Sequence, residues 1–224
     1  MGWYDAFMFI GHQAVAFAAK RVAPRTSLGV LMGAAMFLDL LWPILVLAGV
    51  EKVRIEPGNT AFTPLAFDYY PFSHSLVTSF AISLLTALGY WLVTRYSRGA
   101  WVVGVAVFSH WVLDFISHGP DMPLSPGVTT RVGLGLWNSV PATLIVEILM
   151  FAGGLWLYTQ TMRPNGKAGR LSLWILVAFM GVSYLGNAFG PPPPNWHALA
   201  WVAMAVWLLP LWAGWVDLQR VAAH

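Results

Sequence analysis

Long apolar segments separated by short polar ones make up most of the chain. From residue 28 onward these segments are each about 20 residues long, the length at which an α-helix crosses a bilayer core. The pattern predicts an all-α fold, a polytopic membrane helical bundle of about six to seven transmembrane helices in one integral membrane domain, 1–224. The predicted helices cover residues 3–19, 28–50, 73–94, 100–118, 139–159, 171–189 and 196–216. The first is short for a span, so it can either cross the membrane or re-enter it.

Composition agrees with a membrane protein and excludes several other classes. The chain is 58% hydrophobic and 9% charged, whereas soluble domains contain about 25% charged residues. Cysteine is absent, which excludes a disulfide framework and thiolate metal ligands. The net charge of +3 is spread over short loops without a basic patch. We therefore expect membrane lipids, and no nucleic acid, as partners.

The distribution of Lys and Arg over the loops predicts an orientation. Nine of these residues lie in one alternating set of segments and three in the other set. Because basic residues concentrate on the cytoplasmic side, we predict that the N-terminus lies outside and the C-terminus in the cytoplasm. The basic set consists of segments 20–27, 95–99, 160–170 and 217–224.

The predicted helix 100–118 carries three ionisable residues within an apolar surrounding. His110, Asp114 and His118 are spaced four residues apart, so a helix places them along one face. Imidazole and carboxylate groups in this arrangement are typical metal ligands. Ionisable side chains at membrane depth are energetically expensive, which makes a functional role the first hypothesis for them.

Four further ionisable residues lie at a similar depth, in the predicted outer half of the membrane. With a rise of about 1.5 Å per residue, they and the three residues of helix 100–118 all fall in the predicted outer half. We therefore expect one polar pocket that opens outward between the helices. The four residues are His12, Asp39, His74 and Glu147.

The order of these residues resembles a known family. His12, Asp39, His74 before Ser-Leu, His110-x3-Asp114 and Glu147 follow one another as in the bacterial inner-membrane metal-dependent hydrolases (YdjM-like, LexA-binding). More remotely they are similar to zinc-dependent phospholipase C and the related single-strand nucleases. The resemblance covers about residues 7–150, the metal-site helices, and leaves out the C-terminal helix pair 171–216. It implies a metal-dependent hydrolase in a bacterial inner membrane.

The chain departs from the family pattern at three places. Tyr69 stands where the family has an earlier histidine, and Thr143 stands where the distant enzymes have the histidine of His-x3-Glu. A second aspartate beside Asp39 is also missing. One or two metal ions are therefore expected instead of three.

These observations together predict the chemistry of the site. Nitrogen and oxygen ligands without thiolate fit zinc, with manganese or iron as alternatives. Glu147 or Asp39 would accept a proton from metal-bound water. The substrate would be a lipid-like molecule with a phosphoester or ester group. The expected metal ligands are His12, Asp39, His74, His110, Asp114 and His118.

Other interpretations of the same residues remain open. The residues can instead bind a passing ion or proton in a transporter, or hold a structural metal in a protein without catalytic activity. Asp39 can orient a histidine from outside the ligand shell. Glu147 can be a ligand or a protonated structural carboxyl group.

Overall fold

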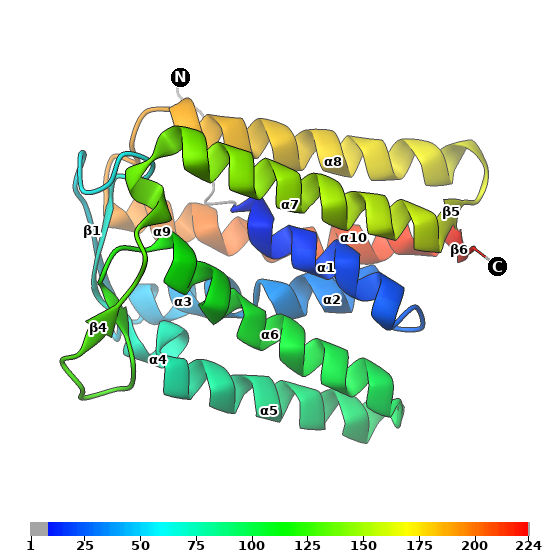
Figure 1. Cartoon of the computed structure of the whole chain (residues 1–224), viewed down its shortest axis with the longest axis horizontal. Helices are drawn as coiled ribbons and strands as arrows, with labels where there is room; N and C mark the ends of the chain where they lie inside the picture. Colours follow the sequence, from blue (N-terminus) through cyan, green and yellow to red (C-terminus); the bar gives the residue numbers. More distant parts are fainter. Residues whose placement is uncertain (1–8, 224) are drawn as a thin grey trace.

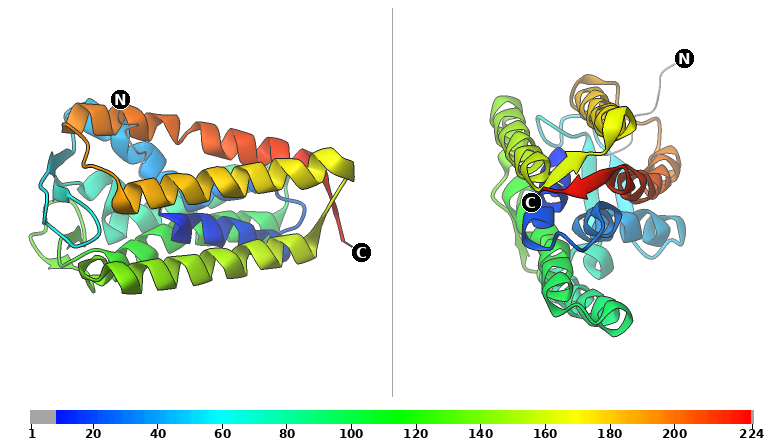
Figure 2. Two further views of the ribbon diagram at one scale, coloured as in Figure 1. Left: turned by 90° about the horizontal axis from the view of Figure 1, so that it is seen from above. Right: turned by 90° about the vertical axis from the view of Figure 1, so that its right-hand side faces the viewer.

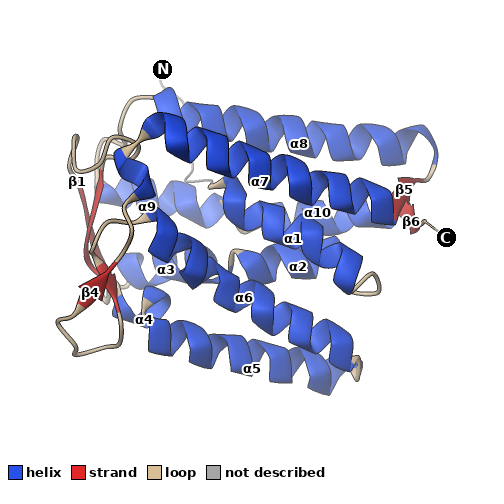
Figure 3. Ribbon diagram, viewed as in Figure 1, coloured by secondary structure: helices blue, strands red, loops and turns tan. Residues whose placement is uncertain are grey.

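The computed structural model describes residues 9–223, which form a bundle of helices lying side by side (Figures 1 and 3). The predicted all-α fold is confirmed. The helices are α1 (Ile10–Val22), α2 (Leu28–Ala35), α3 (Phe37–Leu47), α4 (Pro71–His74), α5 (Leu76–Thr94), α6 (Ser97–Ser117), α7 (Val140–Thr161), α8 (Gly166–Phe189), α9 (Trp196–Ala205) and α10 (Leu208–Leu218), with a 3-10 turn, η1 (Leu136–Asn138).

Five helices of the described residues are long and apolar enough to cross a membrane, and six if α2 and α3 form one bent span. They are α5, α6, α7, α8 and the continuous pair α9–α10. The first predicted helix, 3–19, lies partly outside the described residues. Its described part, α1, has 13 residues and reaches about 20 Å, which is less than the roughly 30 Å of a bilayer core.

Burial distinguishes the central helix from the helices that face lipid. Most side chains of α1 are buried, and α1 packs against α7, α2 and α6 in the middle of the bundle (Figure 2). Gly154 lets α7 approach closely, because a Cβ atom there would collide with the Ala14 carbonyl of α1. In contrast, only 11% of an apolar 18-residue stretch of α5 is buried, and only 17% of the corresponding stretch of α7. Apolar surface left uncovered to this extent is suited to lipid contact.

Short antiparallel strand pairs cover the two ends of the bundle. At one end lie β1 (Lys52–Ile55) with β2 (Leu65–Tyr69), and β3 (Met122–Pro123) with β4 (Arg131–Val132). We call this the hairpin end. At the opposite end β5 (Met162–Pro164) pairs with β6 (Arg220–Ala222). The two alternating loop sets of the sequence therefore lie at opposite ends, as spans that run back and forth require.

The α2–α3 pair is bent by 56° at a single residue. Met36 leaves helical geometry with φ −105° and ψ 10°, and α3 begins at the next residue. The bend turns the first helical turn of α3, which carries Asp39, toward α6. Ala35, the last residue of α2, also contacts α6 through its carbonyl group.

A buried charge network joins four helices at the end opposite the hairpins. The Lys20 ammonium group of α1 lies 2.5 Å from the Asp217 carboxylate of α10. Asp217 also accepts hydrogen bonds from the Leu28 amide at 3.0 Å and the Tyr158 hydroxyl at 3.0 Å. The Lys20 group donates a second bond to the Thr26 carbonyl at 2.9 Å. With both charges paired and hydrogen-bonded, this network is suited to fixing the relative positions of α1, α2, α7 and α10.

We expect Asp217→Asn to destabilise the fold strongly. The substitution keeps the side-chain shape but leaves the buried Lys20 charge without its counter-charge, which costs about 3–5 kcal/mol. Tyr158→Phe removes one hydrogen bond and should cost about 1 kcal/mol. The free energy of unfolding in detergent micelles measures both. Equal small losses for the two variants would contradict a charge-based lock.

Candidate metal centre

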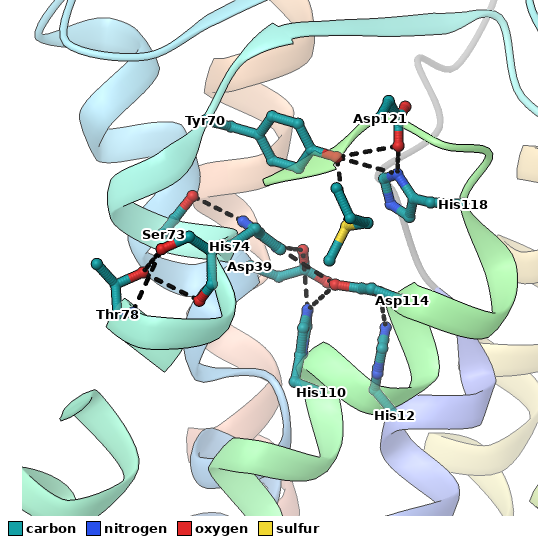
Figure 4. Close-up of polar contacts among 12 residues, drawn as sticks. His12, Asp39, Tyr70, Ser73, His74, Thr78, His110, Asp114, His118 and Asp121 are labelled. Atoms are coloured by element: carbon teal, nitrogen blue, oxygen red, sulfur yellow. Dashed lines mark hydrogen bonds and ion pairs between the residues drawn. The ribbon is translucent and has the colours of Figure 1, made fainter. Parts of the chain in front are cut away.

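Five of the predicted site residues converge below the hairpin end (Figure 4). They come from four helices: His12 from α1, Asp39 from α3, His74 from α4, and His110 with Asp114 from α6. Two groups of three can hold a metal ion, namely His12–His110–Asp114 and Asp39–His74–His110. Segments that are up to 102 positions apart in the sequence therefore meet at one place.

Four of the five residues form a closed ring of alternating imidazole and carboxylate groups, which we call the ligand ring. His74 Nε2 lies 3.5 Å from Asp39 Oδ1 and 3.6 Å from Asp114 Oδ2. His110 Nε2 lies 3.5 Å from Asp39 Oδ1 and 3.2 Å from Asp114 Oδ2. Neighbouring ligands bound at about 2.0–2.2 Å to one ion are separated by about 3.0–3.5 Å. The ring therefore has the spacing of ligands around one metal ion.

Two atoms of the ring are buried without a hydrogen-bond partner. They are His110 Nε2 and Asp114 Oδ2, which face each other across 3.2 Å. A buried polar atom without a partner costs about 1–3 kcal/mol, and more when it is charged. A metal ion between the two atoms would satisfy both of them, so this donor set fits a cation.

The orientation of His110 is fixed from its other side. Its Nδ1 lies 2.8 Å from the Ala35 carbonyl oxygen. A carbonyl group only accepts hydrogen bonds, so Nδ1 carries a proton, and in the neutral imidazole the lone pair lies on Nε2, which faces the ring. This second hydrogen bond is typical of histidines that bind metal.

His12 is adjacent to the ring but takes a different position. Its Nε2 lies 3.1 Å from Asp114 Oδ1, the carboxylate oxygen that does not face His74 and His110. Its imidazole stacks on that of His110 with centroids 3.8 Å apart and planes at 5°. A metal ion bound in the plane of one ring lies out of the plane of the other, so this stacking favours the ligand ring over the His12–His110–Asp114 group as the place of an ion. The geometry supports one ion in the ligand ring, with His12 holding Asp114 in place.

His118, expected as a ligand, lies in neither three-residue group. His118 ends α6, and its backbone N–H still bonds the Asp114 carbonyl oxygen at 2.7 Å, but its imidazole is bonded to a side chain of the following loop. Nδ1 of His118 lies 3.0 Å from Asp121 Oδ1.

Tyr70 contacts the same carboxylate. Burial, together with the nearby Asp121 carboxylate, raises the pKa of Tyr70 well above its usual value. The Tyr70 hydroxyl therefore stays protonated and donates to Asp121 at 3.1 Å.

Glu147, expected as a base or ligand, also lies outside both groups. Its carboxylate faces the backbone amides of Ile10 and Gly11 in the first turn of α1. No side chain of the preceding residue caps this helix, and a carboxylate stabilises a helix N-terminus. Glu147 and His12 line a small cavity that is separate from the one beside the ligand ring. The structure therefore places Glu147 where it supports α1 and, through α1, the position of His12.

A cavity of about 30 Å³ adjoins the ligand ring, with room for one or two water molecules. Asp39, His74 and Asp114 line it, together with Ala203 of α9 and Val206, the residue after this helix. The C-terminal helix pair, which the family resemblance leaves out, thus forms part of the wall. The remaining wall residues are mostly aromatic or apolar: Phe9, Trp42, Leu65, Phe67, Tyr70, His118 and Trp137.

We expect His110→Ala and Asp114→Ala to lose the bound metal, because each removes a buried ring ligand. His118→Ala should retain it, since His118 is bonded to Asp121 instead of the ring. Elemental analysis of the three purified variants in detergent gives the metal content per chain. Wild-type metal content in both His110→Ala and Asp114→Ala would eliminate the proposed ligand ring.

No protein-family model, curated protein or solved structure matches this chain. The assignment of a function therefore depends on the geometry of the ligand ring, its cavity and the groups that surround them.

Proposed function

We propose that the chain is a membrane-embedded, metal-dependent hydrolase that acts on a lipid-borne phosphoester or ester. The observation that carries the proposal is the ligand ring, in which two buried atoms lack partners beside a cavity large enough for water. Two imidazoles and two carboxylates without thiolate suit zinc, with manganese or iron as alternatives. Such an ion lowers the pKa of bound water to about 7 and polarises a phosphoryl or carbonyl oxygen.

Asp39 is the ring residue best placed to accept a proton. Its side chain is 28% exposed, whereas the other three ring side chains are at most 5% exposed. Its Oδ1 contacts both ring histidines, which leaves Oδ2 for water or substrate. A general base must lie within hydrogen-bond reach of the proton that it removes, and Asp39 satisfies this requirement because it also lines the cavity.

His118 also lines this cavity. Because Asp121 accepts from its Nδ1, Nε2 is the nitrogen available to a substrate. An imidazole held in this way can bind or protonate the oxygen of a leaving group. Under this proposal His118 acts on the substrate and not on the metal.

The surroundings of the site support a substrate from the bilayer. The cavity lies within a bundle whose long helices carry exposed apolar side chains, and its walls are largely aromatic. The family resemblance of His12, Asp39, His74, His110 and Asp114 implies the same reaction class and an inner-membrane location. We propose this location, with the hairpin end facing outward, from the distribution of Lys and Arg.

A transporter is the second candidate, because a broken helix, the α2–α3 pair, lies beside the site. The break is at Met36, and α3 packs on α9 and α2 on α10. Discontinuous helices of this kind form ion sites in many transporters. The buried Lys20–Asp217 pair closes the opposite end of these helices, which favours the hydrolase over a through-path.

We expect hydrolysis of a phosphoester-bearing lipid by protein reconstituted in nanodiscs to stop after chelation and to return with added zinc. At saturating metal, Asp39→Asn should reduce turnover about 100-fold or more, because it removes the proton acceptor. His197→Ala, at an exposed position, is the matched histidine control and should retain full activity. Product release that continues unchanged in chelator would refute the hydrolase, and metal-dependent flux into proteoliposomes without hydrolysis would favour the transporter.

A further inference from the structure

A carboxylate from a neighbouring loop contacts the ligand ring indirectly. Glu51 follows α3 and is only 1% exposed, although it lies in a segment of charged loop residues. Its Oε1 accepts hydrogen bonds from the Phe72 and Ser73 amides, both at 2.8 Å. Its Oε2 accepts a bond from the Ser73 hydroxyl at 2.6 Å. Both oxygens are therefore directed at the turn that carries His74.

The hydrogen bonds from Glu51 to His74 have only one consistent direction. A carboxylate only accepts, so the single hydroxyl proton of Ser73 points at Glu51. Ser73 Oγ lies 2.7 Å from His74 Nδ1 and must then accept from it. Nδ1 of His74 therefore carries a proton, and in the neutral imidazole the lone pair lies on Nε2, the nitrogen that faces Asp39 and Asp114.

We infer that Glu51 is a positioning residue that, through Ser73, sets the tautomer in which His74 Nε2 can bind a metal. The use of this tautomer rests on the proposed metal site, but the relay itself is a property of the metal-free protein. Partners of this kind orient metal-binding histidines, and their loss typically reduces metal affinity 10–100-fold.

Glu51 also has a structural role, and different atoms carry the two roles. Oε1 holds the Phe72 and Ser73 amides at the start of α4, whose first residue, Pro71, has no N–H group. Oε2 alone contacts the Ser73 hydroxyl. An amide in place of the carboxylate can keep the first role and reverse the second, which makes Glu51→Gln a selective test.

In Glu51→Gln the amide oxygen can still accept from the two backbone amides, while its NH2 group donates to Ser73 Oγ. The Ser73 proton then turns to His74 Nδ1, which must become the acceptor, and the proton moves to Nε2. We expect a 10–100-fold loss of zinc affinity with an almost unchanged melting temperature. The ¹⁵N chemical shifts of the His74 ring in the metal-free protein, assigned with His74→Gln, should change from the Nδ1–H to the Nε2–H tautomer.

Two controls separate the relay from a general effect on stability or charge. Ser73→Ala interrupts the relay, so adding Glu51→Gln to it should cause no further loss of zinc affinity. Glu56→Gln removes an exposed carboxylate from the same loop and should bind zinc like the wild type. An Nδ1–H signal in Glu51→Gln, or an undiminished effect of Glu51→Gln in the Ser73→Ala background, would overturn the inference. Absence of zinc binding by the wild type would instead refute the proposed function, and the ring shifts would still decide the relay.

Discussion

The fold depends on the requirement that an ionisable group inside an apolar bundle must have a partner. The protein meets this requirement differently at its two ends. Near the β5–β6 strand pair, Asp217 is surrounded by the Lys20 ammonium group and two neutral donors, so charge and hydrogen bonding are both satisfied. Below the hairpin end, the carboxylates of Asp39 and Asp114 face imidazoles, and two ring atoms have no hydrogen-bond partner. The first arrangement is complete in itself, whereas the second would be completed by a cation.

Sequence periodicity was sufficient to predict the helical bundle, and it indicated several of the ionisable residues that the structure brings together. Four-residue spacing on one helix predicted that His110 and Asp114 act together, and depth along the helices placed Asp39 and His12 beside them. His118 lies outside both three-residue groups, since spacing along a helix does not reveal that Asp121 of the next loop bonds its imidazole. Glu147 also lies outside them, since the depth of a residue does not reveal which neighbouring helix its side chain faces. Glu51 carried no signal, because only the folding of the chain between α3 and α4 brings it to Ser73, the residue before His74.

The four side chains of the ligand ring differ in their exposure to solvent. The side chains of His74, His110 and Asp114 are at most 5% exposed, while that of Asp39 is 28% exposed. Enclosed ligands would hold an ion in fixed geometry, and an exposed ligand would leave room for the exchange of water at the ion. The wall residues from the α9–α10 span show that the final helix pair limits the size of what can approach. A site with these properties would bind an ion rigidly through its enclosed ligands and leave the side of Asp39 accessible to water or substrate.

The bend between α2 and α3 is connected to the imidazole of His110. Its Nδ1 contacts the last residue of α2, and its Nε2 lies beside Asp39 in the first turn of α3. One aromatic ring thus touches the backbone before the bend and the side chain after it. A cation coordinated by Nε2 and Asp39 would favour the bent over the straight form of this helix pair. The angle of a broken helix and the occupancy of an ion site are then thermodynamically linked, so each stabilises the other.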